Sequence, residues 1–283
     1  MIKPVIAVIA AGAMGSGVGA RLTESSVDVV TSLAGRSEAS AARAKQAGMR
    51  PVSDADIGQA MIILSIVPPS EALALAERLS PVLKAAAQKP LYIDCNAVSS
   101  ATAKAIAGVI AQTGAPFADA GIIGGPPKAG YDGPSIYVSG VPASASSAVQ
   151  LLLSRGLKLR SLDGPVGAAS ALKMSYAAIT KGLTAIASAS ILAAGRHGAA
   201  EALHAELSAS QKAILAAVTR SVPDMFNKAY RFVGEMEEIS AHAERPSTAM
   251  IYRGIAQLYQ ELASDLEADK RDIATLDAFF KAK

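Results

Sequence analysis

The chain has 283 residues, a formal net charge of +3, 51% hydrophobic residues and 18% charged residues. This apolar content is enough to bury a sizeable core, so disorder is excluded as the main state. A nucleic-acid partner is not expected, because the net charge is small and no basic cluster is interleaved with aromatic residues. The single cysteine, Cys95, excludes an internal disulfide and a cysteine-based metal site.

The apolar segment Val5–Ala11 runs directly into a series of glycines. This pattern is typical of a buried strand that enters a glycine loop, and it favours that interpretation over a signal peptide. The spacing of His197, His204 and His242 does not match a metal site. We therefore expect a soluble, cytoplasmic protein that binds no metal and contacts no membrane.

The first half of the chain alternates short apolar runs with longer, alanine-rich segments. The apolar runs predict strands at Val5–Ala10, Val27–Leu33, Met61–Val67, Leu91–Asp94, Pro116–Ala120 and Ile136–Ser139. The segments between them predict helices at Met14–Glu24, Ser37–Ala47, Ser70–Leu83, Ser99–Gln112 and Ala143–Arg155. Strict alternation of strand and helix predicts an α/β fold, a Rossmann-type doubly wound sheet that is mainly parallel.

The pattern changes near residues 163–166, after which strand signals nearly vanish. We therefore predict a cofactor-binding Rossmann domain at residues 1–163 and an all-helical domain for substrate binding and dimerisation at 166–283. The helices expected in the second domain are Gly167–Gly195, Glu201–Val218, Phe226–His242 and Thr248–Leu266. Pro223 and Pro246 are expected at or near helix starts, where proline is tolerated.

The glycine loop after the first strand resembles the dinucleotide fingerprint G-x-G-x-x-G, with Ala10 at the first glycine position. Gly12 would let the backbone approach a pyrophosphate, and Gly15 would let the helix pack closely on the strand. Ala13 and Met14 would open that helix, whose free N–H groups suit phosphates. A plain strand–helix turn is the alternative, but the position between strand and helix favours a dinucleotide site.

The second predicted strand ends at Ala34-Gly35-Arg36-Ser37. An NAD enzyme usually has an acidic residue there, which binds the ribose hydroxyls. Arg36 can instead pair with a 2′-phosphate, and Ser37 can add a hydroxyl. The segment therefore predicts NADP rather than NAD as the cofactor, with a solvated loop arginine as the alternative.

Four more segments follow the glycine loop with Met14 along the chain. They are Val67-Pro68-Pro69, Asp94–Ser99, Asp119–Pro126 and Gly164–Lys173. Together these resemble the β-hydroxyacid dehydrogenase superfamily, which includes 3-hydroxyisobutyrate and 6-phosphogluconate dehydrogenases. The resemblance implies that Val67, Pro68 and Asn96 lie beside the nicotinamide. It also implies that Ile123, Gly124 and Gly125 belong to the substrate motif, and that Lys173 is the catalytic lysine.

The chain departs from the family pattern at two places. Ile123 stands where the substrate motif has a serine, and Tyr176 and Ala177 stand where an asparagine follows the lysine. The second domain resembles a poorly characterised branch of the superfamily. The substrate identity therefore cannot be carried over.

Hydride transfer also needs a group that handles one proton. Lys173 is the best candidate, because it lies near the start of a long apolar helix where desolvation would lower its pKa. Tyr176 could donate a hydrogen bond or take over the proton, and Lys181 could hold a substrate carboxylate. Ordinary helix residues with solvated heads are the alternative for Tyr176 and Lys181.

These features predict an NADP-dependent oxidoreductase that acts on a small hydroxy or carbonyl compound, such as a hydroxy acid. An imine or pyrroline-carboxylate reductase is one alternative, and a non-catalytic NADP-binding protein is another. The alanine-rich second domain has little aromatic mass to fill a monomeric core. We therefore expect a symmetric homodimer that packs through the long helix near Gly167–Gly195.

Overall fold

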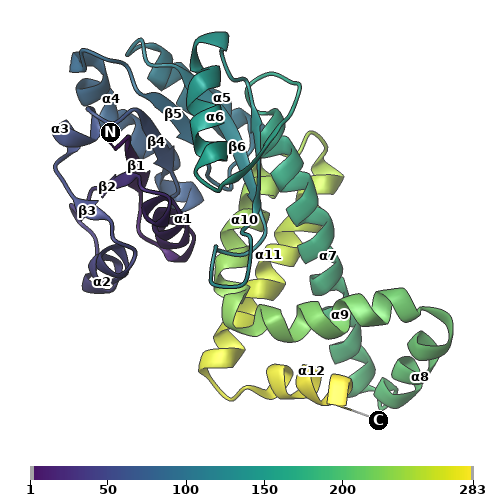
Figure 1. Ribbon diagram of the computed structural model, residues 1–283. Helices are drawn as coiled ribbons and strands as arrows, with labels where there is room; N and C mark the ends of the chain where they lie inside the picture. Colours follow the sequence, from purple (N-terminus) through teal and green to yellow (C-terminus); the bar gives the residue numbers. More distant parts are fainter. Residues whose placement is uncertain (1–2, 282–283) are drawn as a thin grey trace. The chain divides into compact units, whose positions relative to one another are not determined.

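In the computed structural model, residues 3–281 are described (Figure 1). They form two compact units, one ending at Lys173 and one beginning at Met174. The division lies inside helix α7 (Ala168–Arg196), beyond the boundary predicted at residues 163–166. The first turns of α7 belong to the first unit because they pack on its sheet, as described below.

The first unit is built on one eight-stranded sheet in the order β3-β2-β1-β4-β5-β6-β7-β8. Its strands are β1 Val5–Ile9, β2 Asp28–Thr31, β3 Arg50–Pro51, β4 Ile62–Ser65, β5 Leu91–Asp94, β6 Phe117–Ile123, β7 Ser135–Ser139 and β8 Lys158–Ser161. All neighbouring strands are parallel except β6 and β7, which are antiparallel. The predicted doubly wound, mainly parallel sheet is confirmed. The strands β3 and β8 were not predicted, because these short edge strands carry charged residues and no apolar run.

Helices cover both faces of this sheet (Figure 1). They are α1 Ala13–Glu24, α2 Glu38–Gln46, α3 Asp54–Ile57, α4 Ala72–Ala85, α5 Ser100–Ala111 and α6 Ser146–Ser154, with 3-10 turns η1 Pro69–Glu71 and η2 Ala143–Ala145. One apolar core joins a face of the sheet to α1, α2 and α6. A second core joins the opposite face to α3, α4 and α5. The strands between these layers are buried on both sides, which explains their continuous apolar runs.

The second unit consists of the rest of α7 together with α8 Ala200–Ser210, α9 Lys212–Met225, η3 Phe226–Lys228, α10 Ala229–Ala241, α11 Pro246–Glu267 and α12 Arg271–Lys281. The segment predicted as one helix, Glu201–Val218, is two helices separated at Gln211, whose backbone is not helical. Pro246 opens α11 as expected, whereas Pro223 lies inside α9 rather than near a helix start. Helix α12 was not predicted, although its residues Ile273, Leu276 and Phe279 are buried in the core of this unit.

Helix α7 is long and apolar enough to cross a membrane by length and composition alone. Core helices of soluble proteins pass the same test. Buried Ser170, Thr184 and Ser188 lie on this helix, and Lys181 on it forms an ion pair. One face of α7 is thus buried against the rest of the protein, whereas Tyr176, Ile179, Leu183 and Ile186 on it are exposed.

Candidate functional site

The strand order reverses between β1 and β4, and ligands of open α/β sheets bind at the carboxyl ends of strands at such a point. The glycine loop follows β1 at this edge. A Cβ on Gly15 would lie 1.8 Å from the carbonyl oxygen of Ala10, so only glycine lets α1 pack this closely on the strand end. A Cβ on Gly12 would meet nothing within 4 Å. The close helix and the open space at Gly12 match the predicted pyrophosphate cradle.

Helix α1 begins directly after Gly12, and no side chain caps its N-terminus. The first N–H groups of a helix have no intrahelical partner, so those of Ala13, Met14 and Gly15 are available to a ligand. The positive end of the helix dipole adds to this preference for an anion. The loop therefore fits the diphosphate of a dinucleotide.

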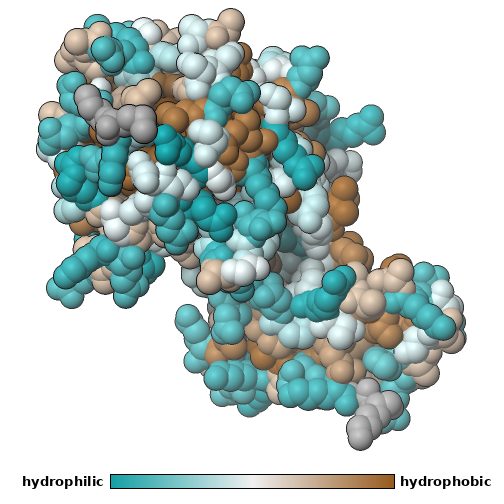
Figure 2. Space-filling view, viewed as in Figure 1, coloured by the Kyte–Doolittle hydropathy of each residue, from teal (hydrophilic) through white to brown (hydrophobic). Residues whose placement is uncertain are grey.

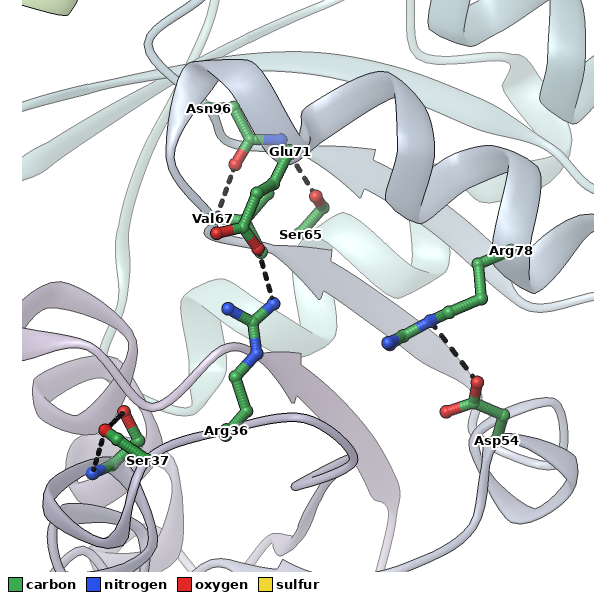
Figure 3. Close-up of polar contacts among 9 residues, drawn as sticks. Arg36, Ser37, Asp54, Ser65, Val67, Glu71, Arg78 and Asn96 are labelled. Carbon is green, nitrogen blue, oxygen red and sulfur yellow. Dashed lines mark hydrogen bonds and ion pairs between the residues drawn. The ribbon is translucent and has the colours of Figure 1, made fainter.

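The loop after β4 is held by a buried amide. Asn96 is 2% exposed, and its Oδ1 accepts a hydrogen bond of 2.7 Å from the backbone N–H of Val67. Its Nδ2 donates to Ser65 Oγ at 2.8 Å (Figure 3). It also donates to Asp94 Oδ1. Asn96 thus uses its side chain inside the protein, where it fixes the turn at Val67 and Pro68.

Asp94 ends β5 and is fully buried beside Asp119 on β6. Burial and, to a smaller extent, the charge of Asp119 together raise the pKa of Asp94 to about 7. One of its oxygens, Oδ2, is buried without a hydrogen-bond partner among the described residues. Burial and the neighbouring carboxylate thus favour the protonated form of Asp94.

Arg36 lies after β2, where the sequence places it, and points across the strand ends toward Glu71 (Figure 3). One of its Nη atoms is 2.8 Å from a Glu71 carboxylate oxygen. Ser37 is the N-cap of α2, and its Oγ accepts the N–H of Ser40. Both residues are at the predicted place, but a carboxylate holds Arg36. The sequence analysis did not identify Glu71, since nothing in the sequence links it to Arg36.

Asp119 connects the sheet to the start of α7. Its Oδ2 accepts the backbone N–H groups of Gly167 and Ser170 at 2.9 and 3.0 Å, and the hydroxyl of Ser139 at 3.2 Å. The hydroxyl of Ser170 donates to Oδ1 at 2.5 Å. A carboxylate is favourable at a helix N-terminus, so Asp119 caps the helix that carries Lys173. Asp119, at the start of the predicted substrate motif, thus fixes the position of this helix.

Lys173 lies next to β6. A Cβ on Gly121 would be 2.9 Å from the Cβ of Lys173 and 2.6 Å from the carbonyl oxygen of Ala169, so glycine allows the helix to approach the strand. The side chain of Lys173 is half-buried. Ile123 ends β6 and is also half-buried, and Gly124 and Gly125 follow it in an exposed loop. The first unit therefore places Lys173 beside β6, the strand that leads into the predicted substrate motif.

Tyr176 and Lys181 belong to the second unit. Tyr176 is 49% exposed. Lys181 forms an ion pair with Glu235, and its ammonium lies 4.1 Å from the centroid of the Phe232 ring. The side chain of Glu235 is itself only 14% exposed. Lys181 is thus held by an internal carboxylate, which disfavours its predicted role as the substrate carboxylate ligand.

Within residues 3–281, no group of three histidine, cysteine, aspartate or glutamate side chains could hold a metal. The Nδ1 atom of His242 lies 3.6 Å from the carboxylate of Glu238, which precedes it by one helical turn.

Two family models match the chain. The model described as the NAD binding domain of 6-phosphogluconate dehydrogenase matches residues 5–161. A second model, described as a domain of unknown function (DUF1932), matches residues 194–262. No curated protein matches the chain.

Several solved structures are similar over nearly the whole chain. A 3-hydroxyisobutyrate dehydrogenase from Mycobacterium tuberculosis is 19% identical with a TM-score of 0.74, over 98% of this chain and 99% of that one. A conserved protein of unknown function, described as structurally similar to 3-hydroxyacid dehydrogenases, is 24% identical with a TM-score of 0.70, over 97% and 99%. An imine reductase from Myxococcus stipitatus in complex with NADP+ is 18% identical with a TM-score of 0.56, over 98% and 99%. At these identities the likeness concerns the fold.

Proposed function

The chain belongs to the family of the NAD-binding domain of 6-phosphogluconate dehydrogenase, in the β-hydroxyacid dehydrogenase superfamily, and is an NAD(P)-dependent oxidoreductase; from that premise we propose that it prefers NADP. We further propose that it transfers a hydride to or from a small hydroxy or carbonyl compound, with a hydroxy acid as the expected substrate. The observation that carries the proposal is the cradle at the end of β1. There Gly15 lets α1 meet the strand and Gly12 leaves open space.

In this proposal the backbone of Gly12, Ala13, Met14 and Gly15 holds the diphosphate, because these residues form the open turn and the first turn of α1. Arg36 and Ser37 follow β2, the strand whose end meets the adenosine ribose in a dinucleotide fold. A guanidinium and a hydroxyl at this place favour a 2′-phosphate over unmodified ribose hydroxyls. The turn that Asn96 fixes at Val67 and Pro68 borders the nicotinamide side. A bound nicotinamide supplies the hydride acceptor or donor.

Lys173 is the proposed proton-transfer residue. It is half-buried against β6, and Asp119 fixes the start of its helix. A lysine held beside a strand end that carries the substrate motif can hydrogen-bond a substrate oxygen and exchange its proton. Tyr176, one turn later on α7, is the alternative proton donor.

The proposed substrate class allows one close alternative. Ile123 removes the serine hydroxyl that the family uses, and a structure of similar fold is an imine reductase with NADP+. An imine, including a pyrroline carboxylate, is therefore the second candidate substrate. A non-catalytic NADP-binding protein is the remaining alternative, in which the cradle is retained without turnover.

Binding and product analysis separate these readings. Titration with NADP and NAD, followed by product analysis on panels of hydroxy acids, ketones and imines, should give NADP-dependent turnover on a hydroxy acid or its keto form. Turnover on imines alone would show that the substrate is an imine and not a hydroxy acid. Tight NADP binding without any turnover would support the non-catalytic protein, and no binding of either cofactor would refute the proposal.

We also propose that the protein acts in the cytoplasm as a homodimer. Apolar side chains remain exposed along α7, at Tyr176, Ile179, Leu183 and Ile186. Figure 2, which has the same view as Figure 1, shows brown hydrophobic surface in the region where Figure 1 draws α7. A contiguous apolar strip of this kind is typical of an interaction surface.

A further inference from the structure

A second arginine, which the sequence analysis did not identify, lies beside the glycine loop. Arg43 is on α2, and its Nε donates a hydrogen bond of 2.9 Å to the carbonyl oxygen of Ala11. Its Nη2 donates a hydrogen bond of 2.9 Å to Ser40 Oγ. Ala11 follows β1 and Ser40 lies in the first turn of α2 after β2. The guanidinium therefore joins the two loops that border the carboxyl ends of these neighbouring strands.

The charge of Arg43 is not neutralised by a carboxylate. Other arginines near this sheet are paired, Arg36 with Glu71 and Arg78 with Asp54. No ion pair includes Arg43 in the part of the chain that the structure describes. The nearest acidic residue before it on α2 is Glu38, which is exposed at the first helical position and is not paired with it.

The guanidinium also keeps donors for a ligand. Arginine has five N–H donors, and the contacts with Ala11 and Ser40 use two of them. The stem is half-buried, so the head group is held in place by its two hydrogen bonds instead of moving freely in solvent. A fixed, unpaired guanidinium with free donors is suited to a phosphate, which it can bind through two parallel hydrogen bonds.

The position of Arg43 indicates which phosphate of a dinucleotide it would bind. In a dinucleotide fold the diphosphate lies at the start of α1, and the adenosine ribose extends from it toward the end of β2. Arg43 lies between these two places, since it contacts the loop after β1 and the helix after β2. Ser37 and Ser40 contribute hydroxyls there, 3.3 Å from each other. The free donors of Arg43 are therefore beside the expected ribose.

We propose that Arg43 is a specificity-determining residue that binds the 2′-phosphate of NADP, with Ser40 as its neighbour in the same phosphate site. The inference rests on the proposed function, because it requires a dinucleotide at the glycine loop. Arg43 would bind this phosphate together with Arg36, whose charge is partly neutralised by the Glu71 carboxylate. Arg43 has no such competing carboxylate among the described residues and can bind without breaking an ion pair.

The test measures binding of paired ligands that differ by the 2′-phosphate. Calorimetric titration of the full chain with NADP and NAD, and with 2′,5′-ADP and 5′-AMP, gives the affinity ratio for each pair. Arg43→Ala should weaken NADP and 2′,5′-ADP by roughly ten- to a hundred-fold, the usual effect of losing a charge-assisted contact. The affinities of Arg43→Ala for NAD and 5′-AMP should stay within about threefold, because neither ligand has a 2′-phosphate.

Two further variants keep the result interpretable. Arg43→Lys retains the charge and the aliphatic stem but not the forked guanidinium, so its affinity for NADP should lie between those of the wild type and Arg43→Ala. This variant still tests the inference if the alanine variant folds poorly. Arg50→Ala is the matched control, because Arg50 is paired with Asp28 at the first residue of β2. The affinities of Arg50→Ala for all four ligands should match those of the wild type.

Equal losses for all four ligands would overturn the inference, because they would show that Arg43 only braces the glycine loop through Ala11. Unchanged binding in Arg43→Ala and Arg43→Lys would also overturn it, while leaving the proposed NADP preference intact if the wild type still favours NADP. A wild type that binds none of the four ligands would refute the proposed function itself and this inference with it.

Discussion

The Ser170 hydroxyl donates a hydrogen bond of 2.5 Å to Asp119 Oδ1, and the backbone N–H of Ser170 donates to the other oxygen of the same carboxylate at 3.0 Å. Both residues are fully buried. One side chain of β6 thus holds the first turn of α7 at two points. Lys173 lies three residues after Ser170, so its position depends on this contact.

Replacement of Asp119 should separate the effect of charge from that of hydrogen bonding. Asp119→Asn keeps an acceptor for the N–H groups of Gly167 and Ser170 and can donate to the Ser170 hydroxyl, so we expect a loss of about 1 kcal/mol in the free energy of unfolding. Asp119→Ala leaves two buried N–H groups without an acceptor and should cost about 2–5 kcal/mol. Urea denaturation at neutral pH measures both losses.

The control for this series is Asp132→Asn. Asp132 is an exposed carboxylate paired with Lys158, and such pairs contribute little to stability. Its free energy of unfolding should match that of the wild type. Equal stabilities for Asp119→Ala and the wild type would show that the cap of α7 is not needed.

The buried carboxyl of Asp94 should make stability depend on pH. Burial first, and then the charge of Asp119, raises the pKa of Asp94 from 3.8 to about 7. Between these values the folded state holds a proton that the unfolded state releases, so stability falls as the pH rises. The slope from one group is at most about 1.4 kcal/mol per pH unit. Asp94→Asn cannot ionise and should lack this component.

Denaturation of the wild type and Asp94→Asn at several pH values from about 5 to about 8 measures this difference. The wild type should lose stability relative to the variant as the pH rises toward 7 and no further above it. Asp132→Asn serves again as the control, because Lys158 lowers the pKa of Asp132 and its titration ends below this range. Parallel curves for the wild type and Asp94→Asn would contradict the raised pKa.

The sequence predicted the sheet and the glycine loop well, because both depend on local patterns. Continuous apolar runs marked β1, β4 and β5, and only glycine can occupy position 15 against Ala10. The edge strands β3 and β8 have no such pattern. Their pairing with the sheet, not their composition, makes them strands.

Side-chain partners that are distant in the chain could not be predicted. Lys181 was a candidate substrate ligand because helical spacing places it near Lys173, but Glu235 from α10 pairs with it. In the same way, Glu71 pairs with Arg36, and Asp119 caps α7 across 51 residues. Periodicity and motif spacing carry no information on such contacts, which depend on the tertiary fold.

The proposed dimer can be tested on the exposed face of α7. Ile179, Leu183 and Ile186 are spaced like the contact positions of packed helices and are between 38% and 71% exposed. The double variant Ile179→Glu/Ile186→Glu should place charges in the interface and give a monomer by light scattering at micromolar concentration, whereas the wild type should be a dimer. Met61→Glu, at an exposed position just before β4, is the control and should remain dimeric. A monomeric wild type would refute the dimer.

The role of Lys173 is tested most directly by comparing it with Tyr176. If Lys173 exchanges the proton, Lys173→Ala should lower turnover by about 10²–10⁴ while NADP affinity stays nearly constant, because the contact is needed mainly in the transition state. Lys173→Arg should not restore turnover, since a guanidinium does not release its proton. Tyr176→Phe, at a half-exposed position one turn later, should keep most of the activity. Inactivity of Tyr176→Phe alone would move the proton role to the tyrosine and favour an imine substrate, and full activity of both variants would place the proton-transfer residue elsewhere.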